Sequence, residues 1–240
     1  MKPTWESDCG SVRLFLGDAL TILPDLPVAC CNALVTDPPW MDYQTGHYDA
    51  TAHHHAITEL APEAYMGMCF RALKWNSAAL VWCRWDSFHA HAVAAAASGF
   101  AVKNCVVWGK SNHTMGDLDG NMGYKHEQAV FAVKGKWKRP GKREVNLWNV
   151  KSLFSRGHRD HPTEKPLALM VRSVEALCPV GATVLDPFFG CGVAGEACAA
   201  TGRGYVGCEI KADYFDIAVA RAKRALAERA AQLPFEEATP

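Results

Sequence analysis

The feature that most constrains the fold is the regular alternation of short apolar runs with stretches of helical spacing. The apolar runs, each short enough for one strand, are residues 12–16, 33–36, 79–83, 102–108, 127–133, 182–185 and 205–208. Helical spacing occupies residues 62–75, 86–99, 165–178, 192–201 and 213–233. Strands that alternate with helices pair in parallel and are covered on both faces. We therefore predict an α/β fold with a mostly parallel sheet and helices on both faces.

Three segments interrupt this alternation. Residues 41–60 are polar and rich in histidine, residues 111–125 are rich in Gly, Asn and Asp, and residues 135–160 are strongly basic. Long segments without regular structure inside a compact domain are usually functional. The length of 240 residues fits one domain, since single domains of this class run to roughly 200–250 residues. We expect a single domain, residues 1–240, in which 41–60 and 111–125 are loops that face a ligand.

The ten cysteines do not form the pattern of a disulfide scaffold. They are scattered, Cys30 and Cys31 are adjacent, and the chain opens without the basic and apolar sequence of a signal peptide. We therefore expect free, mostly buried thiols in the reducing cytoplasm. No apolar run reaches the ~18 residues that span a membrane, so we expect no membrane segment.

A glycine-rich turn, Asp186-Pro-Phe-Phe-Gly-Cys-Gly192, follows one apolar run and opens a helical stretch. Glycines at such a turn let the backbone approach a ligand closely. Glu209 lies 19 residues after Gly190, at the end of the next apolar run, where an acidic residue can hold a ribose diol. The alternative is an ordinary strand-to-helix turn with a carboxylate at a strand end. The strand–turn–helix–strand context favours the nucleotide-like ligand.

A second strand end carries Thr36-Asp-Pro-Pro-Trp40. In such folds ligands bind at the carboxyl edge of the sheet, where Asp37 would lie. The two prolines remove two backbone donors and stiffen the turn. A rigid, acceptor-rich edge beside an indole suits a planar ligand that carries an amino group. Taken alone, a plain Pro-Pro turn with a buried Trp is an equally good interpretation.

Together, Asp37-Pro-Pro-Trp40 and the turn 186–192 resemble the amino-methylating DNA methyltransferases that use S-adenosylmethionine. The catalytic motif precedes the cofactor motif, which is the permuted order of the β class. The resemblance spans about residues 12–220 and implies a Rossmann-like fold with circularly permuted motifs. Further matching strings are Gly17-Asp-Ala-Leu20, Val106-Val-Trp-Gly-Lys110, Lys125-His-Glu-Gln-Ala-Val-Phe-Ala-Val-Lys134, His161-Pro-Thr-Glu-Lys-Pro166 and Gly207-Cys-Glu-Ile210.

The resemblance also implies roles for individual residues. Asp37 and the Pro38 carbonyl would hold the amino hydrogens of a base that has left the duplex stack, Pro39 completes the motif, and Trp40 would stack on the base. The amine attacks the methyl group directly, so no cysteine is expected to act as a nucleophile. Glu209 would bind the ribose of the cofactor. The implied cofactor-binding set is Asp18, Ala19, Asp37, Thr163, Lys165, Asp186, Phe188, Gly190, Gly192 and Glu209.

In the resembled family, Asp at the first motif position usually accompanies adenine N6, and Ser more often accompanies cytosine N4. Asp37 therefore favours a site-specific adenine-N6 DNA methyltransferase of the restriction–modification kind. Cytosine-N4 methylation is the closest alternative, and a non-catalytic nucleic-acid-binding relative is another. RNA ranks below DNA, although messenger-RNA adenine methyltransferases share Asp-Pro-Pro-Trp, because the rest of the chain does not resemble them. A small-molecule or protein-amide substrate is disfavoured by the basic segment.

The basic segment, residues 134–160, carries nine Lys and Arg against two acidic residues, whereas the whole chain has a formal net charge of zero. Cations neutralise phosphates, and the interleaved Trp137 and Trp148 could stack on bases. We interpret the segment as a short target-recognition insert for double-stranded DNA, because β-class members insert recognition elements here; a solvated face is the alternative. The expected DNA contacts are Lys136, Lys138, Arg139, Lys142, Arg143 and Arg156.

Two histidine features have less specific interpretations. His47 and the consecutive histidines 53–55 lack the spacing of a metal site, so we expect no bound metal and a loop that faces DNA. His126 and Glu127 are interpreted as structural, holding their strand beside the active site. Dimers are frequent in the resembled family, so a homodimer stays open.

Overall fold

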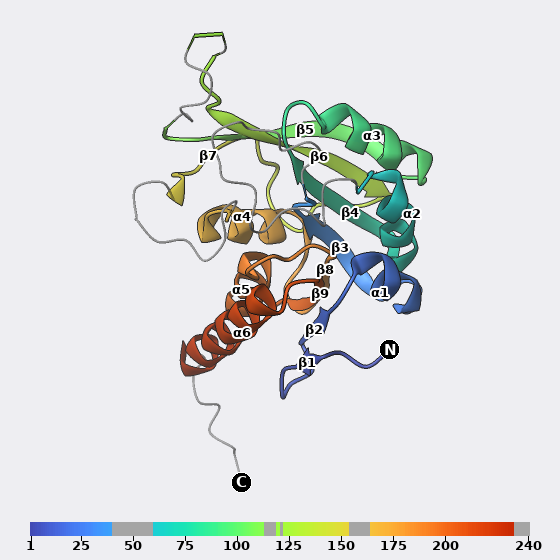
Figure 1. The fold of residues 1–240 in the computed structure, drawn as a ribbon, viewed down its shortest axis with the longest axis vertical. Coiled ribbons are helices and arrows are strands. Elements are labelled where there is room, and N and C mark those ends of the chain that lie inside the picture. Colours follow the sequence, from blue (N-terminus) through green and yellow to red (C-terminus); the bar gives the residue numbers. More distant parts are fainter. Residues whose placement is uncertain (40–59, 113–118, 121, 154–163, 233–240) are drawn as a thin grey trace.

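The computed structural model describes residues 1–39, 60–112, 119–120, 122–153 and 164–232. These residues form a nine-stranded sheet with the strand order β1-β2-β9-β8-β3-β4-β6-β5-β7 (Figure 1). In chain order the strands are β1 (Trp5–Glu6), β2 (Val12–Leu16), β3 (Cys31–Thr36), β4 (Leu73–Cys83), β5 (Ala101–Gly109), β6 (His126–Lys134), β7 (Leu147–Asn149), β8 (Thr183–Asp186) and β9 (Gly204–Glu209).

The centre of the sheet is parallel, as the sequence predicts. Strands β2, β9, β8, β3 and β4 are parallel to one another. β6 is antiparallel to both β4 and β5, β7 is parallel to β5, and β1 is antiparallel to β2. The carboxyl ends of the five central strands therefore lie along one edge of the sheet. Asp37 follows β3 at this edge, and the glycine-rich turn 186–192 follows β8 there.

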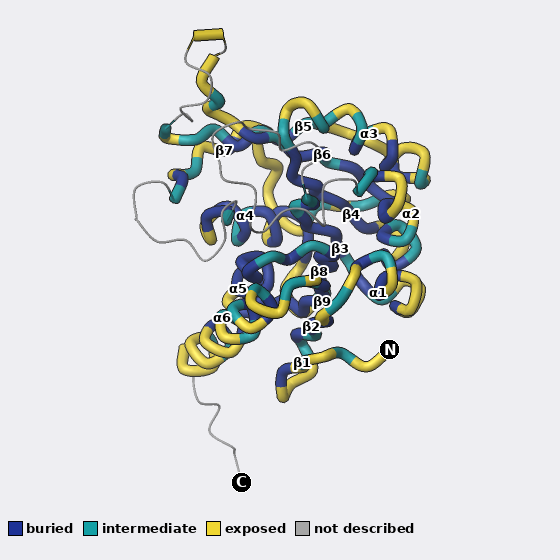
Figure 2. Tube along the Cα trace, in the orientation of Figure 1, coloured by how far each residue is buried: buried dark blue, intermediate teal, exposed yellow. Residues whose placement is uncertain are grey.

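Helices cover both faces of the sheet. One face carries α1 (Ala19–Asp25), α2 (Glu63–Ala72) and α3 (Phe88–Ala97), and the other carries α4 (Leu167–Leu177), α5 (Val193–Ala200) and α6 (Ala212–Gln232) (Figure 1). Successive strand residues point to opposite faces, so Leu80 packs with the α4–α6 side and Val81 with the α1–α3 side. Burial is concentrated in the strands between the two layers (Figure 2).

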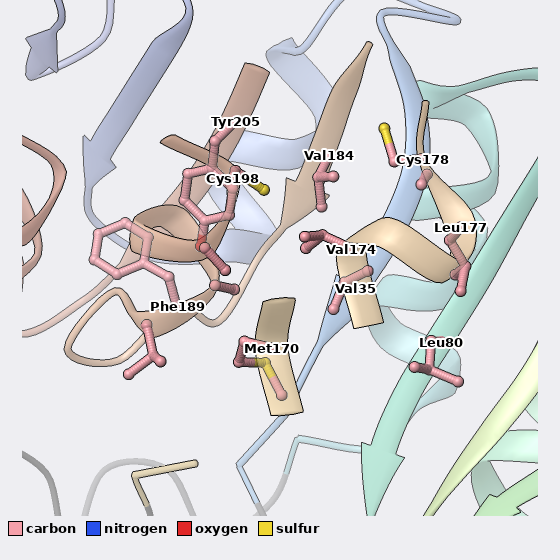
Figure 3. Packing of buried hydrophobic residues seen from close by; sticks show 14 of the residues in the cluster. Val35, Leu80, Met170, Val174, Leu177, Cys178, Val184, Phe189, Cys198 and Tyr205 are labelled. Carbon is pink, nitrogen blue, oxygen red and sulfur yellow. The ribbon is translucent and has the colours of Figure 1, made fainter. Parts of the chain in front are cut away.

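The core on the α4–α6 side supports the glycine-rich turn 186–192. Met170, Val174 and Leu177 of α4 project toward Val35 and Leu80 on the sheet (Figure 3). These side chains are at most 5% exposed, and burial of each such side chain contributes about 1.5–3 kcal/mol. Phe189 and Tyr205 belong to the same cluster. The glycine-rich turn is thus anchored on a well-packed core.

The junction of α2 and β4 differs from the sequence prediction. A helix over 62–75 is predicted, but α2 ends at Ala72 and β4 starts at once, because Leu73 is extended (φ −81°, ψ 140°). Lys134 Nζ donates to the carbonyl oxygens of Phe70 and Leu73, at 2.6 Å each. This ammonium satisfies carbonyls at the helix end, a long-range contact that helical periodicity cannot reveal.

Three smaller features were also missed or misplaced. Asp18 caps α1, a helix that the sequence pattern does not predict. Helical spacing predicts a helix from residue 86, whereas α3 begins at Phe88 with Ser87 as its N-cap, and the Asp86 carboxylate pairs with Arg84 at 2.5 Å. Strand β7 lies within the basic segment, which we expected to lack regular structure.

All ten cysteines are free thiols, and seven of them are buried, as predicted. Among the described residues, no helix is both long and apolar enough to cross a membrane.

Candidate active site

Two distant motifs meet at the carboxyl edge of the sheet. β3 and β8 are neighbours, with Leu34 opposite Leu185, so Asp37 follows β3 close to the place where β8 ends at Asp186. The Thr36 hydroxyl donates a hydrogen bond of 2.7 Å to Asp186 Oδ1 across 150 residues of sequence. This bond directly joins the Asp-Pro-Pro-Trp motif to the glycine-rich turn.

The glycine-rich turn has a backbone that only glycine adopts readily. Gly190 and Gly192 have φ values of +54° and +80°, and Gly192 is the N-cap of α5. A Cβ on Gly192 would lie 2.5 Å from the Cβ of Ala218 on α6. The turn is therefore held tightly against α6, and its shape depends on glycine at this position.

Glu209 lies beside this turn at the end of β9. Its Oε2 accepts from the Gly190 N–H at 3.0 Å, and its Oε1 accepts from the Lys211 N–H at 2.8 Å. Burial raises the pKa of this half-buried carboxyl despite the backbone donors that favour its charged form. The carboxylate is thus fixed in direct contact with the turn, at the strand end where the sequence places it.

Asp18 and Ala19 lie at the end of the neighbouring strand. Leu16 of β2 is opposite Glu209, and the Gly17 N–H donates to the Glu209 carbonyl at 2.8 Å. The exposed Asp18 carboxylate accepts from the Leu20 N–H, whereas Ala19 is buried. The carboxylates of Asp18 and Glu209 therefore follow two neighbouring strand ends, and each can accept hydrogen bonds from a ligand.

Asp186 itself points into the protein. Its carboxylate accepts hydrogen bonds from the Thr36 hydroxyl, from the Tyr205 hydroxyl at 2.8 Å and from the Phe188 N–H at 3.2 Å. Burial outweighs these bonds and raises the pKa of Asp186 to about 6. Asp186 therefore supports the backbone of the turn from inside the protein. In the same turn, the ring of Phe188 packs edge to face on Tyr65, with ring centroids 4.9 Å apart.

Asp37 lies at the other side of the same edge, half-buried, with Pro38 buried and Pro39 half-buried. Asp37 Oδ2 accepts from Lys165 Nζ at 2.5 Å, and Lys165 Nζ also lies 3.0 Å from Glu127 Oε2. Glu127 Oε1 in turn accepts from Lys110 Nζ at 2.5 Å. Four charged side chains of alternating sign thus form one line that ends on Asp37.

Sequence reasoning found part of this arrangement. It placed Asp37, Asp186, Gly190 and Glu209 together, because parallel strands share one carboxyl edge. It missed Thr36 and Tyr205, whose hydroxyls hold Asp186, and it connected Lys165 to the cofactor but not to Asp37. Lys110 and Glu127 were visible as polar residues at the ends of two strands, but their partners come from other elements.

Some of the expected site residues lie outside the described part of the chain. They are Trp40, Thr163, Arg156, His47 and residues 53–55.

The basic segment is only partly available to a ligand. Lys136, Lys138, Lys142 and Arg143 are exposed. Arg139 is half-buried, and its guanidinium pairs with Glu144 at 2.9 Å. Four of the five described residues that we expected to contact DNA are therefore exposed cations.

The prediction that Trp148 stacks on bases is wrong. Trp148 is 2% exposed, and its ring packs against Trp82 at 6.0 Å between centroids. It is buried because β7 pairs with β5 and brings the segment onto the sheet. Trp137 packs edge to face on Phe131 at 5.5 Å, so it too contributes to the packing of the segment.

A mostly parallel sheet whose carboxyl edge carries a glycine-rich turn, strand-end carboxylates and an acidic Pro-Pro motif has the architecture of a methyltransferase that uses S-adenosylmethionine. The chain matches the DNA methylase family, whose members modify adenine N6 or cytosine N4, over residues 31–220. Because the match covers most of the chain, this protein belongs to that family, and its cofactor is S-adenosylmethionine.

Individual relatives support this assignment. The chain is 29% identical over 202 residues to the Escherichia coli (strain K12) protein named "Putative methylase YubD", covering 84% of this chain and 86% of the relative. The solved complex of M1.HpyAVI with SAM is 25% identical, with a TM-score of 0.69, covering 88% of this chain and 99% of that one. The cytosine-N4-specific PvuII DNA methyltransferase shares the fold, with a TM-score of 0.73 at 15% identity over 95% of this chain and 94% of that one.

Proposed function

We propose that this protein transfers a methyl group from S-adenosylmethionine to the exocyclic N6 of a flipped adenine in a specific short sequence of double-stranded DNA. One observation carries the proposal. The carboxylate of Asp37 lies at the carboxyl edge of the sheet, and its neighbour Thr36 is hydrogen-bonded to Asp186 of the glycine-rich turn. The Asp37 carboxylate, which we assign as the acceptor for the amine, thus lies beside the turn that we assign to S-adenosylmethionine.

The residues of the edge have separable tasks. Asp37 accepts one amino hydrogen of the base, and the carbonyl of Pro38 accepts the other, so that the nitrogen lone pair is directed at its target. The cofactor supplies an electrophilic methyl group on sulfur. Proline at 38 and 39 keeps backbone donors away from the amine. Catalysis then rests on positioning and electrostatics and needs no covalent enzyme intermediate.

The choice of adenine rests on Asp37, the residue type that usually accompanies adenine N6 in this family. Cytosine N4 is the competing outcome, since the family includes both specificities. Exposed Lys136, Lys138, Lys142 and Arg143 would contact the phosphates of the duplex. Residues 134–160 are thus proposed as the target-recognition insert.

Mass spectrometry of nucleosides tests the proposal. Purified protein is incubated with S-adenosylmethionine and unmethylated bacterial genomic DNA, and the DNA is then digested to nucleosides. We expect N6-methyladenine. N4-methylcytosine in its place would overturn the choice of base, and no methylated nucleoside would overturn the activity.

The variant Asp37→Ala supplies the matched control for that assay. It removes the amine acceptor, so we expect at least about a 100-fold loss of methyl transfer, the scale seen when one aligned electrostatic contact is removed. Cofactor affinity is measured by calorimetry on the same variant, so that a loss of methyl transfer is separated from a loss of cofactor binding. Retention of full activity would show that Asp37 does not hold the amine.

A further inference from the structure

The line of charges that ends on Asp37 reaches far beyond the motif. Lys110 lies one residue past β5, Glu127 is the second residue of β6, and Lys165 precedes α4. We propose that Glu127 and Lys110 are positioning residues for methyl transfer, which act on Asp37 through Lys165. This inference rests on the proposed function, because it concerns how Asp37 is held ready for the target amine.

The line is largely shielded from water. The side chains of Lys165, Glu127, Lys110 and Asp37 are 4%, 11%, 16% and 22% exposed. The formal charges alternate and sum to zero. A buried ion pair is stable only when its charges are balanced and well oriented, and removal of one partner leaves an uncompensated buried charge. Each member of the line therefore has an opposite charge beside it.

Lys165 is the member that touches Asp37. Burial, the largest single influence, would lower the pKa of Lys165, but Asp37 and Glu127 together outweigh it and raise that pKa above its ordinary value. Glu127 lies between two ammonium groups. Burial would raise the pKa of Glu127, but Lys165 and Lys110 reverse this effect and lower it. Both groups thus stay charged around neutral pH.

The shared position of Lys165 has a consequence for Asp37. An ammonium that had Asp37 as its only carboxylate would neutralise it and compete with the target amine. Because Glu127 also attracts the Lys165 ammonium, the electrostatic attraction of Lys165 is shared between two carboxylates. The distance of 2.5 Å between Lys165 Nζ and Asp37 Oδ2 still fixes the orientation of the Asp37 carboxylate. Lys110 balances the second charge of the line, so that Glu127 stays at its place between the two ammonium groups.

The test compares Glu127→Gln with a matched control. Glu196 on α5 also lies between two cations, Arg221 and Arg224, and its side chain has the same 11% exposure as that of Glu127. Glu196→Gln therefore removes an equally buried carboxylate from outside the proposed line. Lys110→Met and Lys110→Arg form a second pair, in which the charge is first removed and then restored.

The readouts separate positioning from general damage. We expect Glu127→Gln to lower kcat by about 10- to 100-fold, the effect of a small misplacement of a reacting group, with the KM for DNA and the cofactor affinity within about threefold. The pH profile should also change. Loss of the Glu127 anion lowers the pKa of Lys165, so kcat should gain an alkaline limb that the wild type lacks up to pH 10.

The control variants give the remaining expectations. Glu196→Gln should keep wild-type kcat and pH profile, Lys110→Met should lose kcat severalfold, and Lys110→Arg should recover most of it. Wild-type kcat and pH profile in Glu127→Gln, or an equal loss in Glu196→Gln, would overturn the inference. If Glu127→Gln fails to fold by circular dichroism, the Lys110 pair decides in the same way, since equal kcat in Lys110→Met and the wild type overturns it.

Failure of the inference is distinguishable from failure of the proposed function. If the wild type methylates DNA and Asp37→Ala does not, the function stands, and the Glu127 and Lys110 variants judge the inference alone. If the wild type transfers no methyl group to DNA, the function fails and the inference falls with it.

Discussion

Two aspartates at the same sheet edge occupy opposite environments. Asp186 is buried among hydroxyl donors, with its pKa raised to about 6, whereas Asp37 is half-buried beside the Lys165 ammonium. The first supports the backbone of a turn, and the second offers a charged acceptor to a ligand. The partners that create this difference lie far along the chain from each aspartate, Thr36 and Tyr205 for Asp186 and Lys165 for Asp37. The sequence places both aspartates at strand ends but does not reveal these partners.

The raised pKa of Asp186 predicts a pH-dependent stability. The folded state holds this proton up to about pH 6, whereas the unfolded chain releases it near pH 3.8, so the contribution is present below pH 3.8 and is lost as the pH rises through 6. Asp186→Asn does not titrate. The wild-type free energy of unfolding, measured against that of Asp186→Asn in urea, should therefore fall by about 2 kcal/mol from pH 4 to pH 7. A difference that stays constant with pH would contradict the burial argument.

At the scale of elements, most predicted strand and helix ends agree with the structure to within two residues, and the largest error is the start of β4, at Leu73 and not at residue 79. β2 was predicted with its observed limits and β8 and β9 to within a residue at each end, because short apolar runs leave little freedom. The end of α2 was misplaced because Leu73 becomes extended while the apolar pattern continues. β7 was missed because three residues in a basic segment carry no strand periodicity, and only their pairing with β5 defines them.

The turn that opens α5 allows a matched pair of glycine variants. Gly192 and Gly181 have nearly the same φ, +80° and +79°, but a Cβ on Gly181 would meet no atom within 4 Å. Gly181→Ala should cost about 1–2 kcal/mol from the left-handed backbone alone. Gly192→Ala should cost about 1–3 kcal/mol more, because its Cβ overlaps Ala218. If urea denaturation gave the same loss in the free energy of unfolding for both variants, α6 would have to move away from the new Cβ without any loss of stability.

At the scale of the whole molecule, neutrality conceals an uneven distribution of charge. Residues 134–160 carry a formal charge of +7, so the remainder of the chain carries −7. The segment leaves the sheet at the end of β6, where Lys134 lies opposite Ser77 of β4, and its chain returns to the sheet at β7 (Figure 1). A duplex attracted to this segment is repelled by the acidic remainder, so charge orients the encounter as well as strengthening it.

Salt dependence of DNA binding tests this distribution. Lys142→Gln with Arg143→Gln should weaken binding and reduce the slope of log K against log salt by about 2, at ~0.9 for each phosphate contact. Lys2→Gln with Lys223→Gln removes the same charge from exposed positions near the N-terminus and on α6, and should leave the slope unchanged. Equal slopes for the two double variants in fluorescence anisotropy titrations would place the DNA elsewhere.

The pairing of β3 with β8 also has a consequence for how the protein folds during its synthesis. Ala33 lies opposite Val184, so the middle of the sheet closes only after some 150 intervening residues are available. Such distant pairings close slowly, because chain entropy must be lost before the contact is made. On the ribosome, Asp37 emerges long before Asp186 and Glu209. A growing chain therefore has no pocket for its cofactor until its last quarter is made, and activity arises in one late step.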